Sequence, residues 1–247
     1  MSEVFRTKGI VLRTVRYGDT SLIVSVYTAL FGLQQYIVKG VRQTSKKGQT
    51  KSVFFQPGAI LELEVYHNEM KHLQFIREYQ WDYIYTTVFS DVVKNAVATY
   101  MIELLQHSLK QPEANPELFY LIESSLQQLD RANDSLAANL PLFFTLHLGT
   151  ELGFQIQGNY TDTTPVLDLR EGNFVSAVPS HTASLTGEAA RTTSIINSIS
   201  FYAELESVKL GRNMRRQLLE AYQQYILLHV QDFGDLRSWK ILQEILG

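Results

Sequence analysis

The chain has 247 residues, of which 45% are hydrophobic and 11% aromatic, and its formal net charge is -3. This composition predicts a folded chain with one large domain or two smaller ones, and it excludes a disordered polymer. The lack of any cysteine excludes disulfides, thiolate nucleophiles and thiolate metal ligands. Because the first residues contain no apolar signal segment and no window approaches the roughly 20 apolar residues of a membrane span, we expect a cytoplasmic, nucleoid-associated protein without a membrane.

The charge is distributed unevenly along the chain. Residues 1–80 hold eleven Lys and Arg against six Asp and Glu, a balance of +5, whereas the remaining 167 residues have a balance of -8. Within the basic region, the thirteen residues from Lys39 to Lys51 include five cations and no acidic residue. This asymmetry predicts two regions with different electrostatic roles.

The region from Phe5 to Gln80 consists of short β-rich segments separated by turn signals. Alternating apolar and polar residues predict five strands, at residues 8–17, 21–28, 33–40, 59–68 and 71–80. A meander of three strands, a basic loop and a closing pair of strands is typical of a small OB-type barrel. We therefore expect a five-stranded OB-fold, the nucleic-acid-binding domain, in residues 1–80.

Beyond Trp81 the hydrophobic period changes from two residues to between three and four, which predicts helices. The predicted helices are residues 88–109, 116–129, 135–153, 192–207, 215–231 and 236–246. Pro141 inside the third helix indicates either a kink or a first-turn proline, and both readings stay open. The polar interval 155–184 carries a hairpin pattern at Val166–Leu169 and Asn173–Ala177. The expected fold class is α+β, with the barrel followed by a mainly helical domain, residues 81–247, that contains a small β-hairpin excursion.

Catalytic motifs are lacking in the sequence. Six histidines are scattered without metal-ligand spacing, and no P-loop, dinucleotide-binding, kinase or nucleophile-elbow signature occurs. Glu62 and Glu64 lie two apart on a predicted strand and could form an acid pair, but their alternation with apolar residues favours a solvated face. We expect no enzymatic activity, no cofactor and no metal.

The basic loop is the strongest candidate site. Its long cationic side chains can reach phosphates from a loop that stands off the barrel, and the first strand supplies further cations. An ordinary solvated charge run is the alternative. The expected DNA-binding residues are Lys39, Arg42, Lys46, Lys47 and Lys51 of the loop and Lys8, Arg13 and Arg16 of the first strand. The aromatic side chains that could stack bases, although each also suits a core position, are Tyr17, Tyr27, Tyr36 and Phe54.

A second basic cluster begins the helix predicted near residue 215. Arginines at a helix N-terminus gain nothing from the helix dipole, so a partner phosphate or carboxylate is expected there. The expected partner-binding residues are Arg212, Arg215 and Arg216.

The sequence resembles the RecO family of bacterial DNA-repair recombination mediators. The resemblance covers nearly the whole chain and rests on the order and spacing of "KGIVLRTVRYGDTSLIVSVYT", "FGLQQYIVKGVRQ", "PGAILELEVY", "LGF" at Leu152–Phe154 and "LRSWKIL". It implies an OB-fold joined to a helical domain, binding of single- and double-stranded DNA, and annealing of complementary strands. It also implies action on strands coated by single-stranded-DNA-binding protein, partnership with RecR, and loading of RecA in the RecF pathway. The family's DNA-contacting basic positions match Lys39 and Arg42, and less closely Lys46 and Lys47.

The sequence departs from the family pattern in one respect. Many members hold a four-cysteine zinc module after the "LGF" element, and this chain has no cysteine, so residues 155–184 resemble that module without its metal ligands. We expect that interval to depend on packing of Val166, Leu167, Phe174 and Val178 and to be looser than the rest.

The sequence thus predicts a non-enzymatic mediator whose barrel holds strand backbones while the helical domain meets the acidic C-terminal tail of the coating protein. The alternative is an interaction scaffold whose barrel docks an acidic partner and binds DNA only nonspecifically; a nuclease lacks a convincing carboxylate cluster. The oligomeric state, the requirement for RecF, the position of the tail site and the barrel face that carries DNA stay open.

Overall fold

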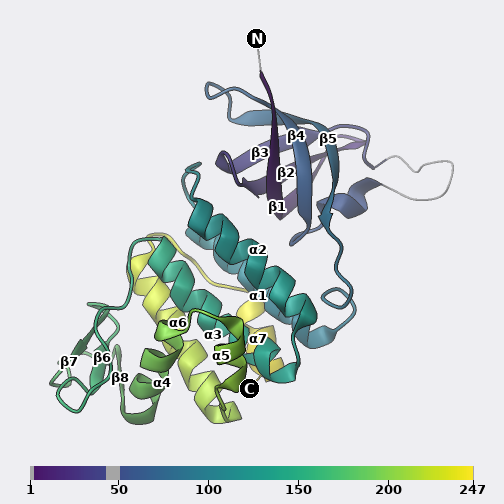
Figure 1. Cartoon of the computed structure of the whole chain (residues 1–247). Coiled ribbons are helices and arrows are strands. Elements are labelled where there is room, and N and C mark those ends of the chain that lie inside the picture. Colours follow the sequence, from purple (N-terminus) through teal and green to yellow (C-terminus); the bar gives the residue numbers. More distant parts are fainter. Residues whose placement is uncertain (1–2, 43–50, 247) are drawn as a thin grey trace. The chain divides into compact units, whose positions relative to one another are not determined.

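The computed structural model describes residues 3–42 and 51–246, which form two compact units (Figure 1). We call residues 1–86 together with 102–127 the barrel unit, and residues 87–101 together with 128–247 the helical unit. The first helix after the barrel, α1 (Val92–Ser108), is divided between the two units.

Five strands close the barrel in the order β1-β2-β3-β5-β4. All neighbouring strands are antiparallel except β3 and β5, which pair in parallel. This closure confirms the predicted α+β fold with an N-terminal OB-type barrel. Between β3 and β4 the chain forms a short 3-10 helix, η1 (Lys51–Phe55). The strands are β1 (Glu3–Tyr17), β2 (Ser21–Thr28), β3 (Gly32–Val38), β4 (Ile60–His67) and β5 (Leu73–Tyr83).

The barrel closes because β1 is long enough to pair with two strands. Its first part pairs with β4 and its second part with β2, and a register shift between Val11 and Arg13 marks the change. Such irregularities bend a strand and increase its twist, which closure requires. Alternate side chains of the strands fill the interior, with Val24, Tyr36 and Leu61 fully buried.

Two helical segments complete the barrel unit, the C-terminal part of α1 and most of α2 (Pro116–Arg131). The side-chain amide of Gln106 on α1 donates a hydrogen bond to the Leu12 carbonyl, at 2.5 Å. On α2 the Phe119 ring stacks on Tyr27 with 6.4 Å between ring centroids. Pro116 occupies the first position of α2, as the sequence predicted.

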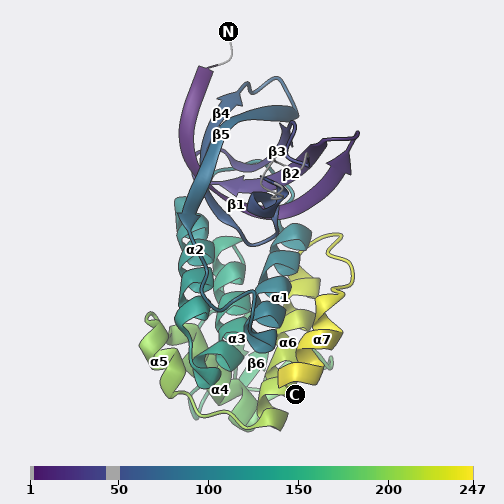
Figure 2. The same ribbon diagram turned by 90° about the vertical axis from the view of Figure 1, so that its right-hand side faces the viewer.

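The helical unit is organised around α3 (Asp134–Glu151), whose residues from Leu136 to Leu146 are all buried. It packs against α6 (Arg212–His229), and the short α7 (Ser238–Leu246) packs on α6 in turn (Figure 2). Pro141 lies inside α3, which excludes the first-turn alternative. Among the described residues, no helix has the length and apolar character needed to span a membrane.

The helix predicted over residues 192–207 is two helices, α4 (Gly187–Ser198) and α5 (Tyr202–Ser207). Ile199 between them is extended, with φ -68° and ψ 128°, and its side chain is buried. Serine and β-branched residues have weak helix propensity, so burial of Ile199 outweighs the continuation of the helix.

The hairpin predicted in the 155–184 interval is confirmed as β6 (Val166–Asp168) and β7 (Asn173–Val175), and a third strand, β8 (Ser184–Thr186), pairs with the other side of β6. The Asp168 carboxylate accepts hydrogen bonds from the amides of Arg170 and Glu171 and lies 3.3 Å from His181 Nε2.

The packing predicted for this interval is only partly right. Val166, Leu167 and Phe174 are buried, but the Val178 side chain is 67% exposed, so its predicted packing role is wrong. Val178 lies in the irregular segment between β7 and β8, where no strand alternation directs its side chain inward.

Within residues 3–42 and 51–246, no three or more His, Asp or Glu side chains form a group that could hold a metal ion. Two statements about residues 155–184 remain predictions: that they are packed more loosely than the rest of the chain, and that they correspond to the zinc module of other family members.

Burial of His147 on α3 leads to a testable pH dependence of stability. Burial lowers the pKa of His147, although hydrogen bonds to the backbone of Ile196 and Ile199 oppose this effect. The unfolded chain takes up the proton near pH 6.5 while the folded chain resists it until a lower pH. Stability is therefore lost as pH falls below about 6.5, by at most about 1.4 kcal/mol per pH unit until the folded pKa is reached.

The measurement is the free energy of unfolding in urea at pH 7.5 and pH 5.5, for the wild type and for His147→Gln. The variant should lose less stability on acidification than the wild type, because its side chain at 147 does not titrate. An equal loss in both proteins would show that other groups cause the pH dependence.

Candidate nucleic-acid interface

A groove on the barrel surface, which we call the β3–β5 groove, brings basic and aromatic side chains together. The groove is lined by the end of β3 and the residues that follow it, the start of η1, the end of β4, the turn between β4 and β5, and β5 itself. Its volume is about 540 Å³. None of the described lining residues is Asp or Glu. The cations of the groove are Lys39, Lys51, Lys71 and Arg77, and its aromatic residues are Tyr66, Phe75 and Tyr79.

The groove forms where β5 crosses beside β3. The parallel register places Phe75 opposite Ile37, and it thereby brings residues of β5 next to the start of the basic loop. Gln74 points inward and is buried, and its side-chain amide donates to the carbonyls of Asn68, at 2.8 Å, and Lys71, at 2.6 Å. Its Oε1 accepts from the Asn68 amide. Because side chains alternate along a strand, the inward Gln74 directs Phe75 outward, and the same side chain holds the backbone of Lys71 at the rim.

Two cations of the groove, Lys39 and Arg77, make only weak contacts with other residues that the structure describes. Lys39 Nζ lies 5.3 Å from the centroid of the Phe75 ring, a cation–π arrangement. Arg77 has one distant ion pair, 3.8 Å from Glu64, and the Arg77 side chain is half exposed. Exposed pairs of this kind contribute little energy, so these cations can exchange their partners for phosphate oxygens at small cost.

The other predicted cations are spread over the barrel. Arg16 and Arg42 line a second hollow, together with η1 residues and Pro57, and Arg42 donates to the Gly18 carbonyl at 2.9 Å. Arg13 is exposed on β1 opposite Ser25 of β2. Lys46 and Lys47 lie outside the described residues. Of the predicted residues that are described, only Lys39 and Lys51 line the β3–β5 groove.

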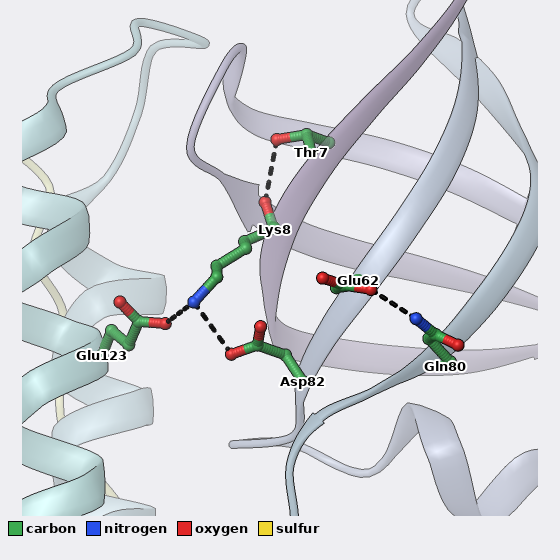
Figure 3. A network of polar contacts seen from close by, with 6 residues as sticks. All are labelled: Thr7, Lys8, Glu62, Gln80, Asp82 and Glu123. Atoms are coloured by element: carbon green, nitrogen blue, oxygen red, sulfur yellow. Dashed lines mark hydrogen bonds and ion pairs between the residues drawn. The ribbon is translucent and has the colours of Figure 1, made fainter.

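Lys8 is held by carboxylates (Figure 3). Its Nζ lies 2.8 Å from Glu123 Oε1 on α2 and 3.1 Å from Asp82 Oδ2 on β5. The hydrogen bond to Glu123 raises the pKa of Lys8, and burial partly opposes this shift. Because two carboxylates compensate its charge, Lys8 attracts a phosphate less than Lys39 does.

The surface beside Lys8 carries mixed charge. Arg6 pairs with Glu64 at 2.8 Å. The Gln80 side chain donates a hydrogen bond to Glu62, as Figure 3 shows. Glu62 and Glu64 therefore have separate partners on a solvated strand face, and they do not form an acid pair. The mixed charges of this face contrast with the β3–β5 groove, whose described charged residues are all basic.

The structure separates the four aromatic residues that the sequence offered for base stacking. Tyr27 and Tyr36 are buried in the barrel, and burial raises the pKa of Tyr36 strongly. Phe54 is partly buried and stacks on Trp81 with 4.6 Å between ring centroids. Tyr17 is about half exposed at the end of β1. Phe75, which is exposed in the groove, was missed by the sequence reasoning, as were Lys71 and Arg77. The OB strand order, which places β5 beside β3, is the signal that could have found them.

The three arginines at the start of α6 have different environments. Arg215 donates to the carbonyls of Leu210, at 3.2 Å, and Leu246, at 3.4 Å, and burial lowers its pKa. Arg216 pairs with Glu220 one turn along the helix, at 3.1 Å. Arg212 is exposed. Arg215 thus connects the segment that precedes α6 to the end of α7, and the exposed Arg212 is accessible to a partner.

Comparisons with known proteins agree with this architecture. A family model described as Recombination protein O N terminal matches residues 1–85, and a model described as Recombination protein O C terminal matches residues 89–240. A protein of Christiangramia forsetii named DNA repair protein RecO is 30% identical over 244 residues, which cover 99% of this chain and 100% of that protein. Proteins of the same name from Phocaeicola vulgatus and Porphyromonas gingivalis are 31% and 25% identical; the matches cover 98% and 97% of this chain and 99% and 98% of the two relatives. The chain belongs to the RecO family.

Proposed function

We propose that this protein is a non-enzymatic mediator of DNA repair and recombination that binds single- and double-stranded DNA through its barrel and anneals complementary strands. The observation that carries the proposal is the β3–β5 groove, which is lined by Lys39, Lys51, Lys71 and Arg77 and by no described acidic residue. The names of the relatives, DNA repair protein RecO, support the same process.

The physical mechanism is neutralisation of the phosphate backbone. Each lysine or arginine that replaces counterions on DNA adds about 0.7 to the dependence of log affinity on log salt for a single strand, and about 0.9 for duplex. These contacts do not read base sequence. Two strands whose phosphates are partly neutralised repel each other less, so they can pair without hydrolysis of a nucleotide.

The helical unit is proposed to recruit the protein partners. These are the acidic C-terminal tail of single-stranded-DNA-binding protein and RecR, with RecA loaded as the indirect result; a requirement for RecF stays open. Arg212 is proposed as a contact for the acidic tail because it is exposed at the start of α6. Arg215 and Arg216, which already have protein partners, are proposed to assist it.

The alternative is a scaffold whose barrel docks an acidic protein surface. The observation that favours it is the ease with which barrel cations pair with carboxylates, as Lys8 does with Glu123 and Arg6 with Glu64. A DNA site releases its ligand to short oligonucleotides and salt. A protein-docking site instead retains a specific acidic partner after nuclease treatment.

The test removes two groove cations with the double variant Lys39→Gln/Lys71→Gln. The salt slope for a single-stranded oligonucleotide should become shallower by about 1.4, and affinity at 0.1 M salt should fall by roughly 20-fold, because two phosphate contacts are lost. Fluorescence anisotropy over a salt series measures both quantities. The rate at which two complementary oligonucleotides anneal should fall in parallel.

The control variant is Lys209→Gln/Lys240→Gln, which removes the same charge from exposed positions of the helical unit. It should leave the salt slope unchanged. Equal effects of the two variants would mean that only the total charge matters, and no effect of either would place the DNA site elsewhere.

A further inference from the structure

We propose that Phe75 is a base-stacking platform that makes the β3–β5 groove bind single strands in preference to duplex. This inference rests on the proposed function, since it assigns the form of DNA that the same groove takes. It depends on three features of Phe75: its exposure, its cationic surroundings and its rigid support.

Phe75 is an exposed aromatic residue on β5. The side chain is 40% exposed although it lies in the strand that closes the barrel, and its described interaction is with the ammonium group of Lys39 rather than with another ring. The outward positions of β5 accept charged residues, as Arg77 two residues further along shows. Neither barrel closure nor core packing therefore requires an aromatic ring at this position.

The cations around the ring suit a strand with unstacked bases. Lys39 approaches the ring from the end of β3, Lys71 comes from the turn that precedes β5, and Arg77 lies on the same face of β5. A base that replaces the Lys39 ammonium over the ring would leave this ammonium free to contact the adjacent phosphate. Aromatic rings combined with a positively charged groove are the usual means of binding single strands without sequence preference.

The ring position is fixed before the strand arrives. Gln74, the neighbouring residue, is buried and hydrogen-bonds Asn68 and Lys71 across the turn. The backbone of Phe75 is held on both sides, because it pairs with Ile37 of β3 and with Tyr66 of β4. A preorganised platform costs little entropy on binding. Stacking on Phe75 then adds to the phosphate contacts.

Duplex DNA cannot use this platform. Each base of a duplex is covered above and below by its neighbours, so a side chain reaches its face only after the base is unstacked and unpaired. The phosphates, in contrast, are available in both forms. The ring therefore adds affinity only for a single strand, and annealing removes that contribution, which favours release of the duplex product.

The experiment compares the binding of three probes to the full chain and its variants: a mixed-sequence oligonucleotide, the same strand with consecutive abasic sites, and its duplex. Phe75→Ala and Phe75→Leu should bind the intact single strand about 5- to 150-fold more weakly, the effect of losing one stacked base. Duplex affinity and the salt slope should stay unchanged. Phe75→Trp should restore single-strand binding. The wild type should bind the abasic strand as weakly as Phe75→Ala binds the intact one.

The control variant is Tyr120→Ala, which removes an exposed ring from α2. It should change none of the three affinities, and thermal unfolding should show that each variant is folded. Equal loss of single-strand and duplex binding in Phe75→Ala, or no loss of either, would overturn the inference.

The same measurements separate this inference from the proposed function. If Lys39→Gln/Lys71→Gln weakens binding of both DNA forms while Phe75→Ala changes neither, the groove binds DNA but the ring is no platform. If neither variant changes binding, the proposed DNA site is itself wrong.

Discussion

Replacing Gly32 with alanine is expected to destabilise the barrel unit by roughly 2–5 kcal/mol. Gly32 begins β3 with φ +60°, and a left-handed conformation costs a residue with a Cβ about 1–2 kcal/mol. The new Cβ would also lie 2.0 Å from the Glu113 carbonyl oxygen and 2.4 Å from its carbon. These are backbone atoms, so the segment between α1 and α2 must move, and overpacking of this kind costs about 1–3 kcal/mol.

Urea unfolding of the variant measures this loss, and Gly18→Ala provides the matched control. Gly18 has a similar φ, +56°, but no atom of the described residues lies within 4 Å of the place that a Cβ would take there, so its replacement should cost only the conformational part, about 1–2 kcal/mol. The difference between the two variants reports the close approach of residues 113–114 to the barrel. Equal destabilisation would mean that this approach is not maintained in solution.

The second large effect is expected for Asp130→Ala in the helical unit. The Asp130 carboxylate is 2% exposed and accepts hydrogen bonds from the amides of Thr87, at 2.8 Å, and Val88, at 3.0 Å. It thereby fixes the chain that leads into α1. Each buried or partly buried donor that loses its partner costs about 1–3 kcal/mol, so the loss of both partners should destabilise the variant by roughly 2–6 kcal/mol.

Asp130→Asn serves as the control because its amide oxygen can still accept from both backbone donors. It should lose roughly 1 kcal/mol, since a neutral acceptor makes a weaker hydrogen bond than a carboxylate. Urea unfolding of both variants at pH 7.5 provides the measurement. If Asp130→Ala were no less stable than Asp130→Asn, the described hydrogen bonds to Thr87 and Val88 would not contribute to folding.

Barrel and helices were predictable because their signals are local. The strands are indicated by period-two alternation, for example in residues 21–28 and 60–67. The connections between strands are indicated by turn glycines at positions 18, 32 and 58. Each of these signals involves residues that are close together in the sequence. The break at Ile199 was missed because it depends on burial of one side chain, which the tertiary structure decides. The exposure of Val178 was missed for a related reason, since apolar character alone does not show which side of an irregular segment is covered.

The candidate site was only half predictable. The sequence by itself determined that the chain is a barrel followed by helices, that the barrel carries the excess of positive charge, and that no thiolate chemistry is available. Only the tertiary structure decided which charges act together. Parallel pairing of β3 with β5 brings Lys71, Phe75 and Arg77 beside Lys39, whereas Glu123, which lies 115 residues away in the chain, compensates Lys8. Coulombic and stacking interactions depend on distance in space, and chain closure sets that distance through contacts that no local pattern contains.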